Sequence, residues 1–276
     1  MHLNEIRKLL RLEQWYKNIL IVTAFLFTQN HLAPLHLALG FLGFCTLSST
    51  TYIINDWMDR EKDRHHPQKK DRPLASGKVT GLQALITGTL LLAFSLYVCT
   101  QLGSLYTFSA AIYFLGTNAY SFGLKNIPLL DIAIILLNFN LRTLAGFQAF
   151  PALNDSVYFV LLSGLVLFAI TSKRKSDRAV LGEKAVAHKP VLKFYTKGLC
   201  RIIITFSYFL VCLGVFTLAM QKEERLIEAL LFVLMMLYTN RCFKQKPELA
   251  IKPHYLFTNP VWILLLLTLL LLPLLG

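Results

Sequence analysis

The chain alternates between long apolar runs and short charged segments. A helix needs roughly 17 to 25 apolar residues to cross a bilayer. Nine runs approach this length, at residues 15–31, 35–55, 80–99, 104–122, 127–148, 156–173, 200–219, 224–241 and 256–275. The pattern predicts an all-α, polytopic membrane protein with nine transmembrane helices. No repeat or low-complexity linker divides the chain, so we expect one domain over residues 1–276.

The charges between the runs predict an orientation. With a cytoplasmic N-terminus, the inner segments are 56–79, 123–126, 174–199 and 242–255, and they hold nearly all the loop Lys and Arg residues. The outer segments, 32–34, 100–103, 149–155 and 220–223, hold only Lys222. This asymmetry is the positive-inside pattern of cytoplasmic membrane proteins. It predicts a multi-pass protein of the inner membrane with its C-terminus outside.

Composition agrees with a membrane protein. The chain is 55% hydrophobic and 16% charged, with a mean hydropathy of +0.53. A soluble domain of this size does not need so large an apolar fraction. A net charge of +13 in a soluble protein would suggest nucleic acid, but here the cations lie between apolar runs. Topology and anionic partners explain them better, so we expect no nucleic-acid partner. The five scattered cysteines predict no disulfide framework.

Polar side chains with regular spacing follow the second apolar run. Asp56, Asp59 and Asp63 lie at i, i+3 and i+7, and Asn55 precedes Asp59 by four residues. On a helix they share roughly one face, where like charges repel. Hard carboxylates with an amide oxygen suit Mg²⁺ that carries a phosphorylated substrate. The alternative is a solvated, charged loop beside the membrane.

This stretch carries a family resemblance. The pattern N-D-x-x-D-x-x-x-D from Asn55, followed by R-P-L-A-S-G from Arg72, resembles the first aspartate motif of the UbiA superfamily of intramembrane prenyltransferases. The resemblance implies a nine-helix bundle whose central cavity is polar at its cytoplasmic end and opens sideways to lipid. It also implies that Asn55, Asp56 and Asp59 are catalytic and that these three residues bind Mg²⁺ together with Asp63. Asp63 and Arg72 are expected to bind substrate.

The fifth run contains ionisable residues at membrane depth. Asp131, Asn138 and Arg142 are spaced by seven and four residues, which places them in one stripe on a helix. Such groups are costly in lipid and normally face a protein interior or a wet cavity. A structural polar seam is one interpretation, and a stripe lining a reaction chamber is the other. The planar donors of Arg142 would suit a phosphate oxygen.

A polar group also precedes the first run. Gln14 and Asn18 are four residues apart, with Lys17 beside them, so amide and ammonium groups can point the same way. An interfacial anchor is the alternative, because Trp and Lys are common at membrane boundaries. The string Q-W-x-K-N resembles one UbiA branch, which implies that Lys17 and Asn18 bind substrate.

The fourth run ends in a polar stripe of Asn118, Ser121 and Lys125, at i, i+3 and i+7. Lys125 alone could be an ordinary inward-facing lysine at a membrane boundary. The string Y-S-x-x-L-K again resembles the family, in which this lysine lies near the phosphate site. We therefore expect Asn118, Tyr120 and Lys125 to bind substrate.

The sixth run leads into K-R-K-S-D-R, from Lys173 to Arg178. UbiA enzymes that alkylate aromatic acceptors usually carry a second acidic D-x-x-x-D cluster here, whereas this chain offers only Asp177 among cations. The string resembles the K-R-x-x-E/D of the decaprenyl-phosphate phosphoribosyltransferase branch, which joins a polyprenyl phosphate to phosphoribosyl pyrophosphate (PRPP). The alternative is a positive-inside signal or attraction to anionic lipid headgroups.

The resemblance implies a Mg²⁺-dependent transfer of 5-phosphoribose from PRPP to a decaprenyl-type polyprenyl phosphate at the cytoplasmic membrane face, with release of pyrophosphate. The cations that would hold phosphates are Lys17, Lys125, Arg142, Lys173 and Arg174, with Asp177 orienting them or touching the ribose. The expected partners are these two substrates and membrane lipids, and a homo-oligomer stays open. The alternatives are prenyl transfer to an aromatic acceptor and a non-enzymatic lipid or solute transporter.

Overall fold

The computed structural model describes residues 3–26, 34–65, 69–148, 156–182, 185, 189–221, 225–246, 249–250 and 259–271. In these ranges the chain forms helices and turns and no strand, so the prediction of an all-α protein is confirmed. The N-terminal elements are α1 (Leu3–Leu10), η1 (Leu12–Asn18), α2 (Ile19–Leu26), α3 (Pro34–Arg64), α4 (Gly81–Leu102) and α5 (Ser104–Phe122). They are followed by η2 (Leu124–Asn126), α6 (Leu130–Gln148), α7 (Ser156–Leu181), η3 (Pro190–Lys193), α9 (Lys197–Gln221), α10 (Arg225–Gln245) and α12 (Pro260–Leu271).

Each predicted apolar run overlaps one of the α-helices α2 to α7, α9, α10 and α12. Within the described ranges, four helices are both long and apolar enough to cross a membrane: Leu35–Arg64, Gly81–Leu102, Val157–Leu181 and Lys197–Thr217. The count of nine transmembrane helices therefore stays a prediction. α3 continues past residue 55, its predicted end, and so carries the acidic residues on a helix.

The chain divides into two compact units. One comprises Met1–Phe122 and Leu141–Leu153, and the other comprises Gly123–Asn140 and Asn154–Gly276. α6 contributes residues to both units. The single domain expected over residues 1–276 stays a prediction.

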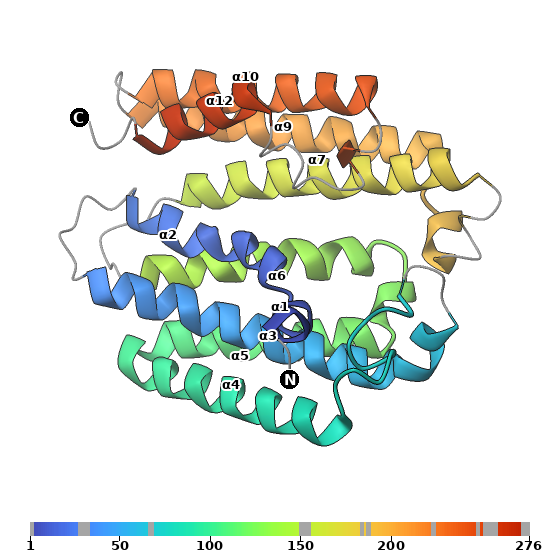
Figure 1. Ribbon diagram of the computed structural model, residues 1–276. Coiled ribbons are helices and arrows are strands. Elements are labelled where there is room, and N and C mark those ends of the chain that lie inside the picture. Colours follow the sequence, from blue (N-terminus) through green and yellow to red (C-terminus); the bar gives the residue numbers. More distant parts are fainter. Residues whose placement is uncertain are drawn as a thin grey trace. The chain divides into compact units, whose positions relative to one another are not determined.

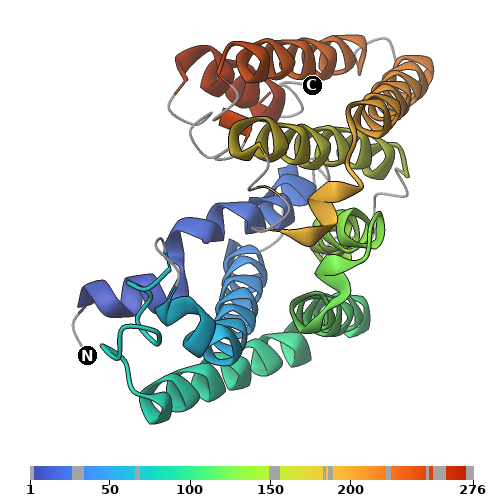
Figure 2. The same cartoon turned by 90° about the vertical axis from the view of Figure 1, so that its right-hand side faces the viewer.

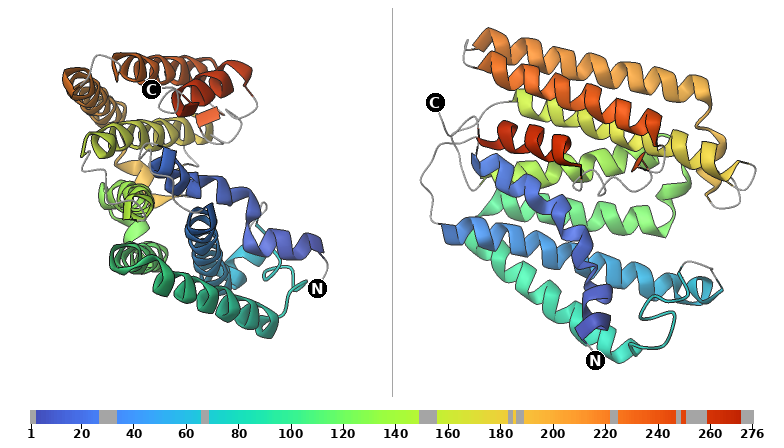
Figure 3. Two further views of the ribbon diagram at one scale, coloured as in Figure 1. Left: turned by 90° about the vertical axis from the view of Figure 1, so that its left-hand side faces the viewer. Right: turned by 45° about the horizontal axis from the view of Figure 1, so that its top comes forward.

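In the first unit, α3 packs against α1, α2, α4 and α5 (Figures 1 and 3). Figure 2 shows α1, η1 and α2 following one another in blue from the N-terminus. The core includes Phe44, Val98 and Tyr106, and the Tyr106 hydroxyl donates to the Gly40 carbonyl at 2.9 Å. A Cβ atom on Gly43 would lie only 2.5 Å from the Tyr106 hydroxyl oxygen. Glycine there lets the helices approach closely, which is how helices associate in lipid.

A run of buried hydroxyl residues marks the middle of α3: Thr46, Ser48, Ser49, Thr50 and Thr51, here called the hydroxyl segment. Its three threonines donate to carbonyls three or four residues earlier in α3, at 2.8 to 3.0 Å. The two serines bond to other elements instead. Ser48 pairs with the Tyr113 hydroxyl at 3.1 Å, and Ser49 donates to the Leu10 carbonyl at 2.8 Å.

In the second unit, α7 packs on α9, α9 on α10, and α10 on α12 (Figure 1). Glycines again permit close approach. A Cβ atom on Gly164 of α7 would lie 2.7 Å from Val211 Cγ2, and one on Gly214 of α9 would lie 2.6 Å from Leu161 Cγ. The loop between α7 and α9 adds Val191, Leu192 and Tyr195 to the core of this unit.

Candidate active site

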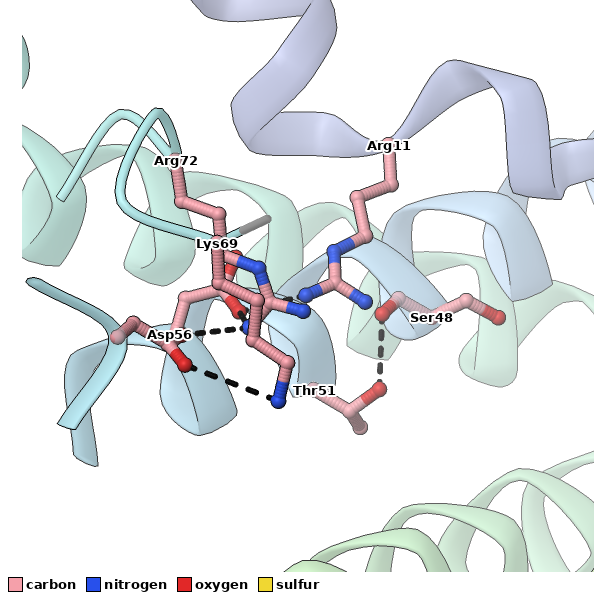
Figure 4. Close-up of polar contacts among 7 residues, drawn as sticks. Arg11, Ser48, Thr51, Asp56, Lys69 and Arg72 are labelled. Atoms are coloured by element: carbon pink, nitrogen blue, oxygen red, sulfur yellow. Dashed lines mark hydrogen bonds and ion pairs between the residues drawn. The ribbon is translucent and has the colours of Figure 1, made fainter. Parts of the chain in front are cut away.

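The acidic residues of α3 meet two arginines in the first unit. Asp56 and Asp63 are each only 3% exposed. Arg72 Nη1 lies 2.9 Å from Asp56 Oδ1 and 2.6 Å from Asp63 Oδ2, so one guanidinium nitrogen bridges the two carboxylates. Arg11 Nη2 lies 2.6 Å from Asp56 Oδ1 (Figure 4). Asp56 and Asp63 therefore share a face of α3, and arginines balance their charge.

Arg72 reaches the acids from the loop between α3 and α4. Two hydrogen bonds stabilise this loop. The Ser76 N–H donates to the Arg72 carbonyl at 2.9 Å, and Arg64 Nε donates to the Ala75 carbonyl at 3.2 Å. Lys69 in the same loop lies 3.8 Å from Asp63 Oδ1. Arg72 was expected in the site from its sequence motif, and in the fold it contacts both acids.

Arg11 is a site residue that the sequence analysis missed. It sits in the turn between α1 and η1 with φ 49° and ψ 51°, a left-handed conformation that is strained for a residue other than glycine. Its side chain spans Asp56 and the ring of Tyr52, whose centroid is 4.6 Å from the guanidinium carbon. Its partner is 45 residues away in the sequence, so no local pattern could reveal the pairing.

These acids fit a magnesium ion in charge and donor type. One oxygen of Asp56 and one of Asp63 contact the same cationic nitrogen of Arg72, so a positive charge already lies between the two carboxylates. Carboxylate oxygens are the ligands that Mg²⁺ prefers. Asn55 and Asp59 are half-buried on the same helix and could complete the set. Across the described ranges, no three His, Cys, Asp or Glu side chains already form a metal-binding group.

A second arginine group is buried in the same unit. Arg142 is 4% exposed; its Nε donates to Asn18 Oδ1 at 2.7 Å, and its Nη2 donates to the Tyr113 hydroxyl at 3.0 Å. The guanidinium also stacks over the Tyr113 ring, 4.5 Å from its centroid. The sequence analysis selected both Arg142 and Asn18, and the structure brings them together. Tyr113 was not expected in the site, because in the sequence it looks like any core aromatic residue in an apolar run.

In the second unit, Asp131 is surrounded by cations. It is fully buried, and its Oδ2 lies 3.1 Å from Arg174 Nη2 and 3.5 Å from Lys189 Nζ. The Tyr195 hydroxyl donates to Asp131 Oδ1. Asp177 is less close, with its Oδ2 4.0 Å from Arg174 Nη1. We call Asp131, Arg174, Asp177, Lys189 and Tyr195 the Asp131 cluster.

Two residues of the Asp131 cluster have shifted pKa values. Burial, reinforced by the nearby Arg174 charge, lowers the pKa of Lys189 to about 8, although Asp131 acts in the opposite direction. Burial raises the pKa of Tyr195, and its hydrogen bond to Asp131 adds to this. The sequence analysis predicted Arg174 and Asp177 here but missed Lys189 and Tyr195. Neither of these belongs to a motif or an apolar stripe.

The other residues expected to bind substrate are Asn118, Tyr120, Lys125, Lys173 and Lys17. Asn118 donates to the Phe114 carbonyl of its own helix at 2.7 Å. Tyr120, Lys125 and Lys173 are half-buried, and so is Lys17, whose Nζ lies 5.9 Å from the Tyr16 ring centroid. The roles assigned to these residues stay predictions.

A cavity of about 320 Å³ lies between α3 and α4. Its lining is almost entirely apolar and includes Ile53, Ile54, Trp57 and Met58 of α3. At 100° per residue, Ile54 and Met58 lie roughly opposite Asp56 around α3, Trp57 lies about 100° from it, and Ile53 lies about 60° from it. Asp56 and Asp63 are not among the residues that line this cavity.

A family model described as "UbiA prenyltransferase family" matches residues 18–261. The decaprenyl-phosphate phosphoribosyltransferase of Mycolicibacterium smegmatis is 29% identical over 230 residues, which cover 80% of this chain and 72% of that protein. The protein of the same name from Corynebacterium glutamicum is 30% identical over 209 residues, covering 72% of this chain and 62% of that protein.

A solved structure shares the fold. The structure of a UbiA homologue from Archaeoglobus fulgidus, bound to GPP and Mg²⁺, matches with a TM-score of 0.71. It is 19% identical in sequence and the match covers 98% of each chain. This likeness establishes the helical fold.

Proposed function

Because the chain belongs to the UbiA prenyltransferase family, whose members are integral membrane enzymes, we propose that it is a polyprenyl-phosphate phosphoribosyltransferase. It transfers 5-phosphoribose from PRPP to a polyprenyl phosphate of the decaprenyl type at the cytoplasmic membrane face and releases pyrophosphate. The observation that carries this proposal is the Asp131 cluster. UbiA enzymes with aromatic acceptors are expected to carry a second acidic motif in the region that corresponds to the end of α7. In this chain that region instead holds the buried Arg174, which approaches the same carboxylate oxygen as Lys189.

The charge requirement of the two possible reactions differs. An aromatic acceptor needs no cation cluster, whereas PRPP and a lipid phosphate bring many negative charges that a metal alone cannot balance. The relatives named decaprenyl-phosphate phosphoribosyltransferase support the same choice. The alternative is prenyl transfer from a polyprenyl diphosphate to an aromatic acceptor; the Archaeoglobus fulgidus homologue bound to GPP and Mg²⁺ shares its fold with this chain.

The acids of α3 form the donor end of the proposed site. Asp56 and Asp63, with Asn55 and Asp59, would hold Mg²⁺, which when bound supplies positive charge to the pyrophosphate of PRPP. Arg72 and Arg11 already neutralise these carboxylates at 2.6 to 2.9 Å. Both guanidinium groups would also bind the pyrophosphate oxygens, through paired N–H donors.

The chemistry needs little from the protein beyond position and charge. The bond between the ribose C1 and the pyrophosphate oxygen breaks, the leaving oxygen keeps the electron pair, and C1 becomes oxocarbenium-like. A polyprenyl phosphate oxygen then bonds to C1. That oxygen is already ionised near neutral pH, so no strong general base is required. In this proposal Lys17, Lys125, Arg142, Lys173 and Arg174 bind phosphate oxygens and Asp177 orients the cations, and positioning and charge neutralisation supply most of the rate.

A turnover assay with two substrate pairs tests the proposal. Purified protein in liposomes with Mg²⁺ receives polyprenyl phosphate plus PRPP in one arm, and polyprenyl diphosphate plus 4-hydroxybenzoate in the other. We expect lipid-linked phosphoribose in the first arm only. Asp56→Asn should abolish it, whereas Asp71→Asn, which changes an exposed acid in the neighbouring loop, should leave it unchanged. Product in the second arm alone would replace this proposal with aromatic prenylation.

The proposed orientation has its own test. We place the N-terminus in the cytoplasm and the C-terminus outside, with nine transmembrane helices in the inner membrane. A reporter that is active only in the cytoplasm should then work when fused to the N-terminus and fail when fused to the C-terminus. Activity at both ends would require an even number of membrane crossings.

A further inference from the structure

Asp131 is held more firmly than an ordinary ion pair requires. It lies in the first turn of α6, where the helix N-terminus favours a negative charge. The Tyr195 hydroxyl donates to its Oδ1 and also accepts from the Leu129 N–H at 3.2 Å. Leu129 has φ 65°, a left-handed conformation that is rare for a branched side chain. The second unit therefore maintains a strained turn where this carboxylate is fixed.

The cations around Asp131 come from two different elements. Arg174 belongs to α7 and Lys189 precedes η3, yet both approach the same oxygen, Asp131 Oδ2, at 3.1 and 3.5 Å. Arg174 is 5% exposed, and its buried Nε has no hydrogen-bond partner among the residues that the structure describes. Leaving a charged donor unsatisfied is costly, so such a group in a native site calls for a missing acceptor.

The charges of the cluster favour an anion as that acceptor. Two cations share one close carboxylate, and Oδ2 of the second acid, Asp177, lies 4.0 Å from Arg174 Nη1. A phosphate offers several oxygens, which suit the fork of an arginine together with the point charge of a lysine. Lys189 is 19% exposed, so the cluster is accessible from its lysine side.

We propose that Asp131 is a positioning residue that holds Arg174 and Lys189 as a paired binding site for a phosphate group of one of the two substrates. This inference rests on the proposed function and adds Lys189, Asp131 and Tyr195 to it. Asp131 itself touches no substrate. It fixes the two cations so that they bind the phosphate without first having to be ordered.

The test measures phosphate affinity separately from turnover. Thermal stabilisation of the purified full-length protein is titrated with PRPP in one arm and with polyprenyl phosphate in the other. The variants are Lys189→Gln, Lys189→Arg and Asp131→Asn, and the matched control is Lys193→Gln, an exposed lysine on η3. We expect Lys189→Gln to weaken one ligand by roughly tenfold to a hundredfold, the range for losing a charge-assisted hydrogen bond. Lys189→Arg should restore most of that affinity, and Lys193→Gln should change neither arm.

The arm that changes identifies the substrate bound by the cluster. Asp131→Asn should weaken the same arm as Lys189→Gln, and KM for that substrate should rise with little change in kcat. If Lys189→Gln lowers stability but leaves both affinities at the wild-type value, the cluster is structural and the inference is wrong. If affinity changes as expected but the wild-type protein makes no lipid-linked phosphoribose, the proposed function fails while the phosphate site stands.

Discussion

Arg142 and Asn18, 124 residues apart in the sequence, share a buried hydrogen bond of 2.7 Å in which the guanidinium Nε donates to the amide oxygen. Asn18 is 1% exposed, and its amide nitrogen donates to Cys45 Sγ at 3.2 Å. This asparagine therefore connects a buried charge to the core of the first unit. Its position beside a basic residue in a predicted span makes it a sensitive place to test the site.

Replacing Asn18 with leucine should destabilise the protein. The change leaves a charged donor of Arg142 without this acceptor, which costs about 1.5 to 3 kcal/mol. Thermal unfolding in detergent measures the effect, and Asn126→Leu, at an exposed position in η2, is the control. Asn18→Asp keeps an oxygen facing Arg142 and should lose less than Asn18→Leu. Equal losses in the two Asn18 variants would show that the contact with Arg142 is energetically unimportant.

The arginine bridge predicts a specific response to magnesium. Arg72→Gln removes the guanidinium that joins Asp56 and Asp63, so the variant should be less stable than the wild type without metal. Added Mg²⁺ neutralises the same carboxylates and should therefore raise the melting temperature more in Arg72→Gln than in the wild type. Arg60→Gln, which removes a more exposed arginine on α3, should respond like the wild type. An equal response in all three proteins would mean that the metal binds elsewhere.

The pKa of Lys189 predicts a pH dependence for phosphate binding. Burial and Arg174 lower this pKa from its ordinary value of 10.5 to about 8, so Lys189 is charged below pH 8 and loses its charge as the pH rises through that value. The groups facing it are Asp131 on α6, Arg174 and Asp177 on α7, and Tyr195 after η3. KM for the phosphate bound by the cluster should therefore rise above pH 8.

Lys189→Arg provides the comparison for this pH dependence, because a guanidinium stays charged at these pH values. Its KM should stay nearly constant between pH 7 and pH 9, a range chosen to bracket a pKa of about 8. If KM rises equally in the wild type and in Lys189→Arg, another group controls the pH dependence.

Gly43 and Gly40 make opposite predictions although they lie one turn apart on α3. A methyl group on Gly43 would lie 2.5 Å from the Tyr106 hydroxyl oxygen and 2.8 Å from Val98 Cγ1, so Gly43→Ala should cost about 1 to 3 kcal/mol. On Gly40 the nearest atom would be Leu102 Cδ1 at 3.4 Å, so Gly40→Ala should instead stabilise the helix by about 0.5 to 1 kcal/mol. Thermal unfolding of both variants checks the packing of α3 against α4 and α5. Similar effects at both positions would contradict it.

The helices were predictable from the sequence because apolar runs of membrane length leave few alternatives. The acids of α3 were predictable too, since Asp56 and Asp63 are separated by two helical turns. Their partners were not. Arg11 and Arg72 meet Asp56 from segments 45 and 16 residues away, and only folding brings them there.

The predicted stripe on α6 shows the same limit. Spacing correctly placed Asp131 and Arg142 on one helix, but it could not say what each contacts. Arg142 joins Asn18 and Tyr113 in the first unit, whereas Asp131 joins Arg174 and Lys189 in the second. No sequence pattern marked Lys189, because it lies in the loop after α7 and only folding brings it near Arg174 and Asp131.

The hydroxyl segment of α3 has a consequence for the synthesis of this protein. Thr46, Thr50 and Thr51 bond to carbonyls of their own helix, so these hydroxyls are satisfied as soon as α3 forms and add little to the cost of inserting it into the bilayer. Ser48 differs, because its hydroxyl partner Tyr113 lies on α5, which the ribosome makes later. Insertion of α3 can therefore precede the arrival of α5, whereas the pairing of Ser48 must follow it.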